Sequence, residues 1–360
     1  MRRRTTLAVA ALPLLHWTAG HAGGVLSPEP RFPPGAPQSE IKPGKGVTAQ
    51  RRLSQWLPAL AGTPGDTAVF VLEGKVPGPT VFVAGGTHNM EMAGVIAATL
   101  LVERAVVQRG RLIVVPRANA SGASWRDPKD LGPGEYTFDT ASGKRTFAVG
   151  TRLTRPTHQG APDPSSYIHP SSQEKLPGYE MRNLNRAHPG KADGNLTQKT
   201  AYALTRLIAV EGAHVAFDLH EAGPRSRLAW LIIANPKNVE QAANAALDLG
   251  DIGIDMRIEA SSPTFRGLSH LEWGEATKAA AYLIETPNPY QASSYDGDPL
   301  EELRKEGDYP LWMRVGVQLE AVMAVLNVHN NSAAPTARFE AVGVPSLADL
   351  KARGIGAFLN

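Results

Sequence analysis

The chain has 360 residues, of which 42% are hydrophobic, and it contains no cysteine. That length and composition suffice for one large core or two smaller ones, and the lack of cysteine excludes disulfides and thiolate metal ligands. The formal net charge is +3, and three of the arginines stand at positions 2–4. Without them the charges balance, which leaves no electrostatic footprint for nucleic acid or an anionic membrane.

The first 22 residues have the pattern of an export signal. Three arginines are followed by an apolar run at residues 7–15 and by a small-x-small cleavage site that ends at Ala22. The apolar run is too short to cross a bilayer. We therefore expect a signal peptide at residues 1–22, for the Sec or the twin-arginine route, and a periplasmic or secreted protein without a membrane anchor after cleavage. Residues 23–50 are rich in Pro and Gly and predict an extended lead-in.

Folded structure is expected to begin with a helix at residues 51–60. Residues 67–74 and 79–86 then have the composition of two neighbouring strands around a Gly/Pro turn. Residues 91–109 have the pattern of a helix that Gly110 ends, and residues 111–119 that of a buried strand. This β-α-β order, with nearly continuous apolar strands, favours parallel pairing and helices on both faces of the sheet.

Residues 118–195 form a long segment with little periodicity, which is typical of a functional or disordered region. Within it, residues 135–140 and 145–150 predict a hairpin. The later elements are helices at 195–212, 238–250 and 310–328 and strands at 214–220, 228–235 and 281–287. Together they predict an α/β fold with one domain at residues 51–330, built on an open, mostly parallel or mixed sheet. A C-terminal tail is expected at residues 331–360, with a short helix at 346–354.

Four polar side chains stand at or just beyond the ends of predicted strands: His88, Glu91, His220 and Glu285. The carboxyl edge of an α/β sheet is where ligands bind. Two histidines and a glutamate form the ligand set of a catalytic zinc with an open fourth position, and a further glutamate can accept the proton of its water. Glu91 alone is also explained as a helix N-terminal acid favoured by the helix dipole, but that explanation does not account for His88.

A second polar group lies inside the long segment, in the sequence MRNLNRAHPG at residues 181–190. Arg182, Asn185 and Arg186 could grip a substrate carboxylate at two points, because guanidinium geometry suits such contacts. Taken alone, the fragment is better explained as a solvated basic turn. By default the remaining histidines in polar loops are expected at the surface, namely His158, His169 and His270, although any of them could line the cleft.

The motifs GGTHxxE, NLNRxxPG, DLHEA and IETP follow one another over about residues 80–290. Their set and order resemble the zinc carboxypeptidase superfamily, in particular its succinylglutamate desuccinylase/aspartoacylase-like branch. The resemblance implies one zinc per chain, bound by His88, Glu91 and His220. It also implies that Glu285 acts as general base and then as general acid.

The same resemblance assigns roles to the polar group in the long segment. Asn185 and Arg186 match the pair that holds the substrate carboxylate. Arg182 is the nearest match to the arginine that polarises the scissile carbonyl, with Arg117 and Arg155 as alternatives.

We therefore expect an exported zinc-dependent amide hydrolase, similar to a deacylase or desuccinylase, that acts on a small molecule or short peptide with a free carboxylate. A metallocarboxypeptidase that trims C-terminal residues, for example from cell-wall peptides, would use the same motifs. A catalytically inactive binding protein on the same scaffold is the alternative from another class, although it would not need Glu285. Serine hydrolase chemistry is disfavoured because the chain has no G-x-S-x-G sequence.

Overall fold

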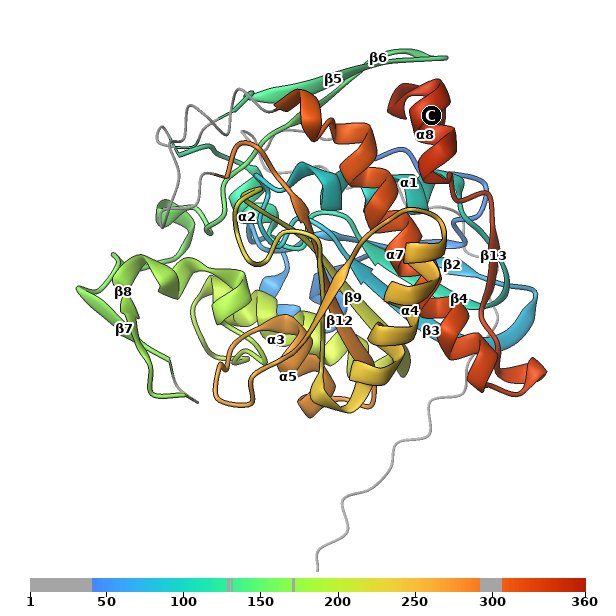
Figure 1. Ribbon diagram of the computed structural model, residues 1–360. Helices are drawn as coiled ribbons and strands as arrows, with labels where there is room; N and C mark the ends of the chain where they lie inside the picture. Colours follow the sequence, from blue (N-terminus) through green and yellow to red (C-terminus); the bar gives the residue numbers. More distant parts are fainter. Residues whose placement is uncertain (1–40, 128–129, 131, 170–171, 292–305) are drawn as a thin grey trace, which may run out of the picture.

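The computed structural model describes residues 41–127, 130, 132–169, 172–291 and 306–360. The predicted signal peptide and most of the predicted lead-in lie outside these residues. The described chain forms a nine-stranded mixed sheet in the order β1-β2-β4-β3-β9-β12-β10-β11, with β13 alongside β4 (Figure 1). The strands are β1 (Ala49–Arg52), β2 (Ala68–Glu73), β3 (Val76–Ala84), β4 (Val106–Val115), β9 (Ala213–Ala222), β10 (Leu231–Ala234), β11 (Arg257–Ala260), β12 (Ala280–Pro287) and β13 (Glu340–Val342).

Helices cover both faces of this sheet, as the sequence predicts. The helices are α1 (Met92–Arg104), α2 (Ala120–Ala123), α3 (Leu196–Val210), α4 (Val239–Asp251), α5 (Ser269–Ala276), α7 (Leu311–Ser332) and α8 (Leu347–Arg353). The helices α1, α4 and α7 share one hydrophobic core with the sheet, and α3 and α5 share another. Along β3, Val83 belongs to the first core and Phe82 to the second, because successive strand residues point to opposite faces.

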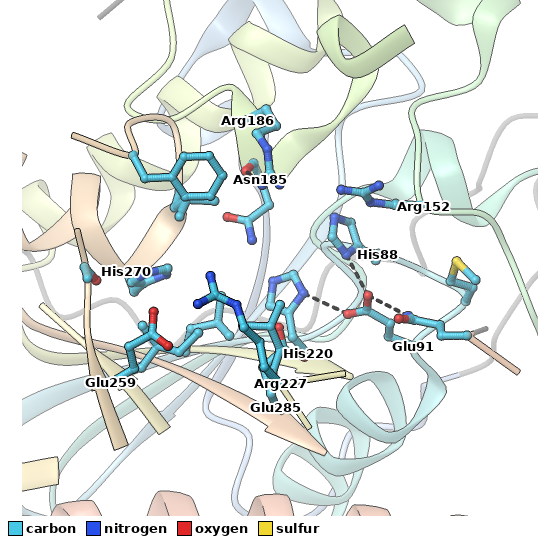
Figure 2. A pocket seen from close by; sticks show the side chains of 18 of the residues that line it. His88, Glu91, Arg152, Asn185, Arg186, His220, Arg227, Glu259, His270 and Glu285 are labelled. Atoms are coloured by element: carbon cyan, nitrogen blue, oxygen red, sulfur yellow. Dashed lines mark hydrogen bonds and ion pairs between the residues drawn. The ribbon is translucent and has the colours of Figure 1, made fainter. Parts of the chain in front are cut away.

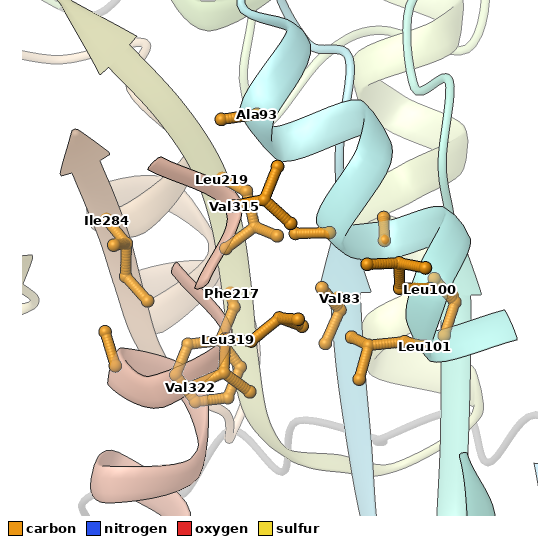
Figure 3. Packing of buried hydrophobic residues seen from close by; sticks show 14 of the residues in the cluster. Val83, Ala93, Leu100, Leu101, Phe217, Leu219, Ile284, Val315, Leu319 and Val322 are labelled. Carbon is orange, nitrogen blue, oxygen red and sulfur yellow. The ribbon is translucent and has the colours of Figure 1, made fainter. Parts of the chain in front are cut away.

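The first core is built around α7, which contacts both α1 and α4. Figure 3 shows Val315 and Leu319 of α7 among Val83, Phe217 and Leu219 of the central strands. The helix is long and apolar enough to cross a membrane, but 61% of its most apolar stretch is buried inside the protein. That burial is the pattern of a core helix.

The central strands β4, β3, β9 and β12 run parallel, and β3-α1-β4 forms the predicted parallel unit. One expectation is wrong: residues 67–74 and 79–86 do not form neighbouring strands, because β4 lies between β2 and β3. Phe70 of β2 pairs with Val114 of β4 in antiparallel register, and Phe82 of β3 pairs with the adjacent Ile113 in parallel register. The turn between β2 and β3 also contacts β4, since the Gly74 amide donates to the Gly110 carbonyl oxygen at 2.9 Å.

The two ends of the described chain also differ from expectation. In place of a helix at 51–60, β1 is followed by two 3₁₀ turns, Leu53–Gln55 and Pro58–Leu60, because Pro58 interrupts the pattern. The predicted C-terminal tail packs on the domain: β13 pairs with β4, and Leu350 of α8 is fully buried. Asn360 donates its backbone N–H to the buried carboxylate of Glu103.

The long segment before α3 holds the predicted hairpin, β5 (Glu135–Thr140) and β6 (Gly143–Ala148), and a second one, β7 (Ser166–Ile168) and β8 (Lys175–Pro177). Two 3₁₀ turns follow, at Gly178–Arg182 and Leu184–Arg186. A β-bridge between Leu153 and Asn183, together with a hydrogen bond from the Thr154 amide to the Arg182 carbonyl oxygen, holds these turns against the stretch that follows β6. The segment therefore forms one wall above the carboxyl edge of the sheet.

Candidate active site

The four polar side chains at the predicted strand ends meet at one place. His220 lies in β9 and Glu285 directly beside it in the parallel strand β12. The turn after β3 brings in His88 through Gly86, whose φ of +66° favours glycine. A Cβ on Gly94 would lie 2.5 Å from the Leu219 carbonyl oxygen, so glycine also lets α1 approach β9 closely.

The carboxylate of Glu91 lies between the two imidazole rings (Figure 2). One oxygen, Oε1, is 2.7 Å from His88 Nδ1, and Oε2 is 2.8 Å from His220 Nδ1. The ring centroids are 4.7 Å apart, and one potential ligand atom from each of the three residues lies within 4.8 Å of the others. All three side chains are buried, so this group could hold a divalent metal ion.

The Nε2 nitrogens of both imidazole rings, which point away from Glu91, also have polar neighbours. His88 Nε2 lies 2.9 Å from Asn183 Oδ1, and His220 Nε2 lies 3.0 Å from Asp218 Oδ2. The Asn183 oxygen also accepts from the Asn185 amide, so it is an acceptor toward His88 and Nε2 donates to it; in the neutral ring Nδ1, on the side of Glu91, is then the nitrogen that can bind a metal. Metal-binding histidines are held in this way by partners on the nitrogen that does not bind the metal. The residues therefore fit a metal with nitrogen and oxygen ligands.

The electrostatics of the group follow from burial and from the neighbouring charges. Burial favours a higher pKa for Glu91, but the positive charges that His88 and His220 can carry hold its pKa below the ordinary value. Burial favours a lower pKa for His220, but Asp218 and Glu91 raise that pKa well above the ordinary value. For His88 burial prevails and lowers the pKa.

Glu285 completes this edge of the sheet. It is 7% exposed, and its Oε2 has no hydrogen-bond partner among the described residues. Burial raises its pKa well above the ordinary value; His220 opposes this shift, and Glu91 adds to it. A cation bound beside Glu285 would lower its pKa and favour the carboxylate.

A cavity of about 630 Å³ lies above these side chains. Asn185 and Arg186, the predicted carboxylate-binding pair, line its upper wall (Figure 2). The Asn185 Oδ1 accepts from the Ser269 amide at 2.9 Å, which fixes the side chain. The Arg186 guanidinium lies 5.1 Å from the centre of the Phe265 ring, and burial lowers its pKa.

Arg182 is not among the residues that line this cavity. Its guanidinium forms a two-point ion pair with Asp163, at 2.7 and 2.9 Å, and donates to the Thr154 carbonyl oxygen. The alternative Arg117 is also turned away, because it donates to Asn89 Oδ1 and to the Ala148 carbonyl oxygen. Both guanidinium groups therefore hold parts of the long segment in place and do not line the cavity.

Arg152 lines the cavity instead, beside His88, and sequence reasoning missed it. Its Nη1 lies 3.2 Å from Glu180 Oε1. No motif surrounds Arg152, so only the folding of the long segment could reveal it. Sequence reasoning also missed the cavity positions of Arg227, Glu259 and Gln291. His270 is buried on α5, with 2% of it exposed, and lines the cavity, which is the alternative to the surface position expected by default.

No family model matches the chain. A curated N-alpha-acetyl-L-2,4-diaminobutyric acid deacetylase from Halomonas elongata is 28% identical over 148 residues, which are 41% of this chain and 29% of that protein. The chain therefore spans less than a third of the length of this relative.

Similar solved structures include a succinylglutamate desuccinylase from a Silicibacter species, with 19% identity, a TM-score of 0.42 and coverage of 73% of this chain and 60% of that one. A metallo-carboxypeptidase from Burkholderia cenocepacia has 12% identity, a TM-score of 0.44 and coverage of 78% and 69%. The chain is thus similar to a deacetylase, a succinylglutamate desuccinylase and a metallo-carboxypeptidase, the group that the motifs of residues 80–290 resemble.

Proposed function

We propose that the protein is an exported, zinc-dependent amide hydrolase that removes an acyl group from a small substrate with a free carboxylate. One observation carries this proposal. The buried group of His88, Glu91 and His220 shares a cavity with the unpartnered carboxylate of Glu285 and with Arg186. Metal ligands, a proton acceptor and a carboxylate-binding cation are what hydrolysis of such an amide requires.

Zinc is the metal that this donor set favours, and when bound it supplies a Lewis acid and lowers the pKa of a water molecule toward about 7. Glu285 accepts the proton of the attacking water and delivers it to the leaving amine. Arg152, beside His88, is placed to stabilise the negative charge that develops on the scissile carbonyl oxygen. Asn185 and Arg186 hold the substrate carboxylate and so fix the amide over Glu285.

The buried carboxylate of Glu285 distinguishes this function from simple binding. An unpartnered buried carboxylate is destabilising, and a binding protein gains nothing from it. Carboxypeptidase action on short peptides uses the same residues and is the second candidate. Deacylation is favoured because the curated relative is a deacetylase that, by its name, acts on an N-acetyl amino acid.

The test is a panel of substrates given to the zinc-loaded protein. We expect turnover of N-acyl amino acids, with a loss of activity when the substrate carboxylate is amidated. Peptides that share the same C-terminal residue separate deacylase from carboxypeptidase activity. Equal activity on acid and amide forms, or no turnover of either class, would contradict the proposal.

Export is part of the same proposal and rests on residues 1–22 of the sequence. N-terminal sequencing of the protein from a periplasmic or culture fraction should begin after Ala22. An intact N-terminus on protein confined to the cytoplasm would contradict export without affecting the proposed chemistry.

A further inference from the structure

The floor of the cavity is set by the register of three strands. Leu283 of β12 pairs with Ile233 of β10, which in turn pairs with Glu259 of β11. Alternate residues of a strand share a face, so Leu283 lies on the same face as Glu285. The cavity floor therefore begins at Glu285, where the proposed reaction takes place. It continues over the apolar side chains of Leu283 and Ile233 and ends at the carboxylate of Glu259 on the edge strand β11. All of these residues line the cavity.

The apolar part of this floor is well packed. Leu283 is 2% exposed and Ile233 is 7% exposed, and they form a small cluster with Leu231, against which Leu228 packs. Two strand spacings separate β12 from β11, which amounts to roughly 10 Å. This floor suits an aliphatic chain of several carbons that leaves the reacting end toward β11.

The carboxylate of Glu259 lies at the far end of the cavity floor. It makes no hydrogen bond or ion pair in the part of the chain that the structure describes, and its residue is exposed. Arg227 lines the same cavity but forms no ion pair with Glu259 among the described residues. The charge of Glu259 is therefore available to a ligand.

His270 lies at the same end of the cavity as Glu259 (Figure 2) and contributes no competing positive charge there. This side chain is 2% exposed, and its Nδ1 has no hydrogen-bond partner among the described residues. Burial lowers the pKa of His270 to about 3, so the ring is neutral near pH 7. A buried polar atom without a partner adds a second indication that this end of the cavity is built for a polar ligand.

We propose that Glu259 binds a positive charge at the end of an aliphatic substrate chain. The substrate is then dipolar, with its carboxylate at Asn185 and Arg186, its amide at Glu285 and an ammonium or guanidinium group at Glu259. This inference rests on the proposed function and narrows its substrate to acyl derivatives of basic amino acids, or to peptides that end in one. A lysine stem has four carbons, which fits the apolar stretch between Glu285 and Glu259.

The experiment compares side chains of similar shape and different charge. The substrates are the Nα-acetyl derivatives of lysine, norleucine and α-aminoadipate, and a dipeptide series with the same C-terminal residues. We expect the wild-type protein to favour lysine over norleucine in kcat/KM by about 10-fold or more, as a hydrogen bond to a charged group contributes. Glu259→Gln should bring this ratio close to one.

Glu240→Gln is the matched control, because Glu240 is an exposed acid on α4 outside the cavity. It should keep the wild-type ratio of lysine to norleucine. An unchanged ratio in Glu259→Gln would overturn the inference. A preference for α-aminoadipate that Arg227→Gln removes would also overturn it, because the far group would then be an anion.

Binding measurements separate this inference from the proposed function. Calorimetry with Glu285→Gln should show tighter binding of the lysine compound than of the norleucine compound, and Glu259→Gln in the same background should remove the difference. If the wild-type protein hydrolyses none of the compounds while this difference holds, the inference stands and the proposed function fails. If it hydrolyses lysine and norleucine compounds equally, the proposed function stands and the inference fails.

Discussion

Glu285 is the residue on which the proposed chemistry depends most. It neighbours His220 across the parallel pair of β9 and β12, and one of its oxygens has no partner among the described residues. Glu285→Gln keeps the shape but cannot accept a proton. We expect this variant to retain its metal and to lose about 100- to 10,000-fold in kcat. Steady-state kinetics together with metal analysis would check this, and a near-normal kcat would show that another group is the base.

His188 is a buried histidine whose titration should affect stability. The Trp273 indole donates to its Nδ1 at 3.2 Å, and burial lowers its pKa to about 4, against 6.5 for an exposed histidine. The unfolded chain therefore binds this proton more readily than the folded protein does. The stability that His188 contributes is complete above pH 6.5 and is lost as the pH falls toward 4.

We predict that His188→Gln reduces the acid sensitivity of the fold. Between pH 7.5 and pH 5 the wild-type protein should lose about 2 kcal/mol more of its free energy of unfolding than the variant, as a shift from 6.5 to about 4 implies. Urea unfolding at both pH values, with a chelator present, measures the difference. Equal losses in the two proteins would mean that His188 titrates normally in the folded state.

At the scale of elements, the long segment between β4 and α3 connects His88 of the candidate metal site to the cavity wall formed by Asn185 and Arg186. The link is Glu180, which is 6% exposed. Its carboxylate accepts from Asn183 Nδ2 at 2.7 Å, and its two oxygens lie 3.2 Å from Arg152 Nη1 and 3.9 Å from Arg186 Nε. Since Asn183 also contacts His88, the position of both arginines is coupled to that of His88.

We predict that Arg186→Ala removes the preference for a free carboxylate. The preference for the acid over the amidated form of one substrate should fall by about 100-fold, because a charged partner of the carboxylate is lost. Arg186→Lys should rescue poorly, since an ammonium cannot form the two-point contact. Kinetics with both substrate forms test this. Equal losses on the two forms would assign Arg186 a structural role.

The C-terminal elements should matter for stability as much as the central ones. Leu350 of α8 is fully buried in the core that α1 and α7 share. We expect Leu350→Ala to lower the free energy of unfolding by about 2–5 kcal/mol, as for other leucines in a packed core. Lys351→Ala, at an exposed position of the same helix, is the control. A loss below about 0.5 kcal/mol for Leu350→Ala, within the range of surface substitutions, would show that α8 is only loosely attached.

At the scale of the whole molecule, the sequence predicted what depends on local pattern. The strand ends that carry His88, His220 and Glu285 follow apolar runs, and a parallel sheet brings such ends to one edge. The hairpin of β5 and β6 likewise follows from its turn and alternation. These features need no knowledge of distant contacts.

The features that the sequence did not predict depend on distant contacts. Arg152 reaches the cavity, and Arg182 does not, because Glu180 and Asp163 set their directions within the irregular segment. The place of β4 between β2 and β3 depends on the α1 crossover. His270 is buried only because α5 packs against the sheet beneath the long segment, which no periodicity of α5 alone indicates.

The most direct measurement is the metal content of the purified protein after loading with zinc. The wild-type protein and Glu285→Gln should each hold one zinc per chain, because Glu285 is not a ligand. His88→Ala and His220→Ala should each lose most of it, because each removes one of three ligands. Full zinc occupancy in both histidine variants, or a wild-type protein that holds no metal, would contradict the account.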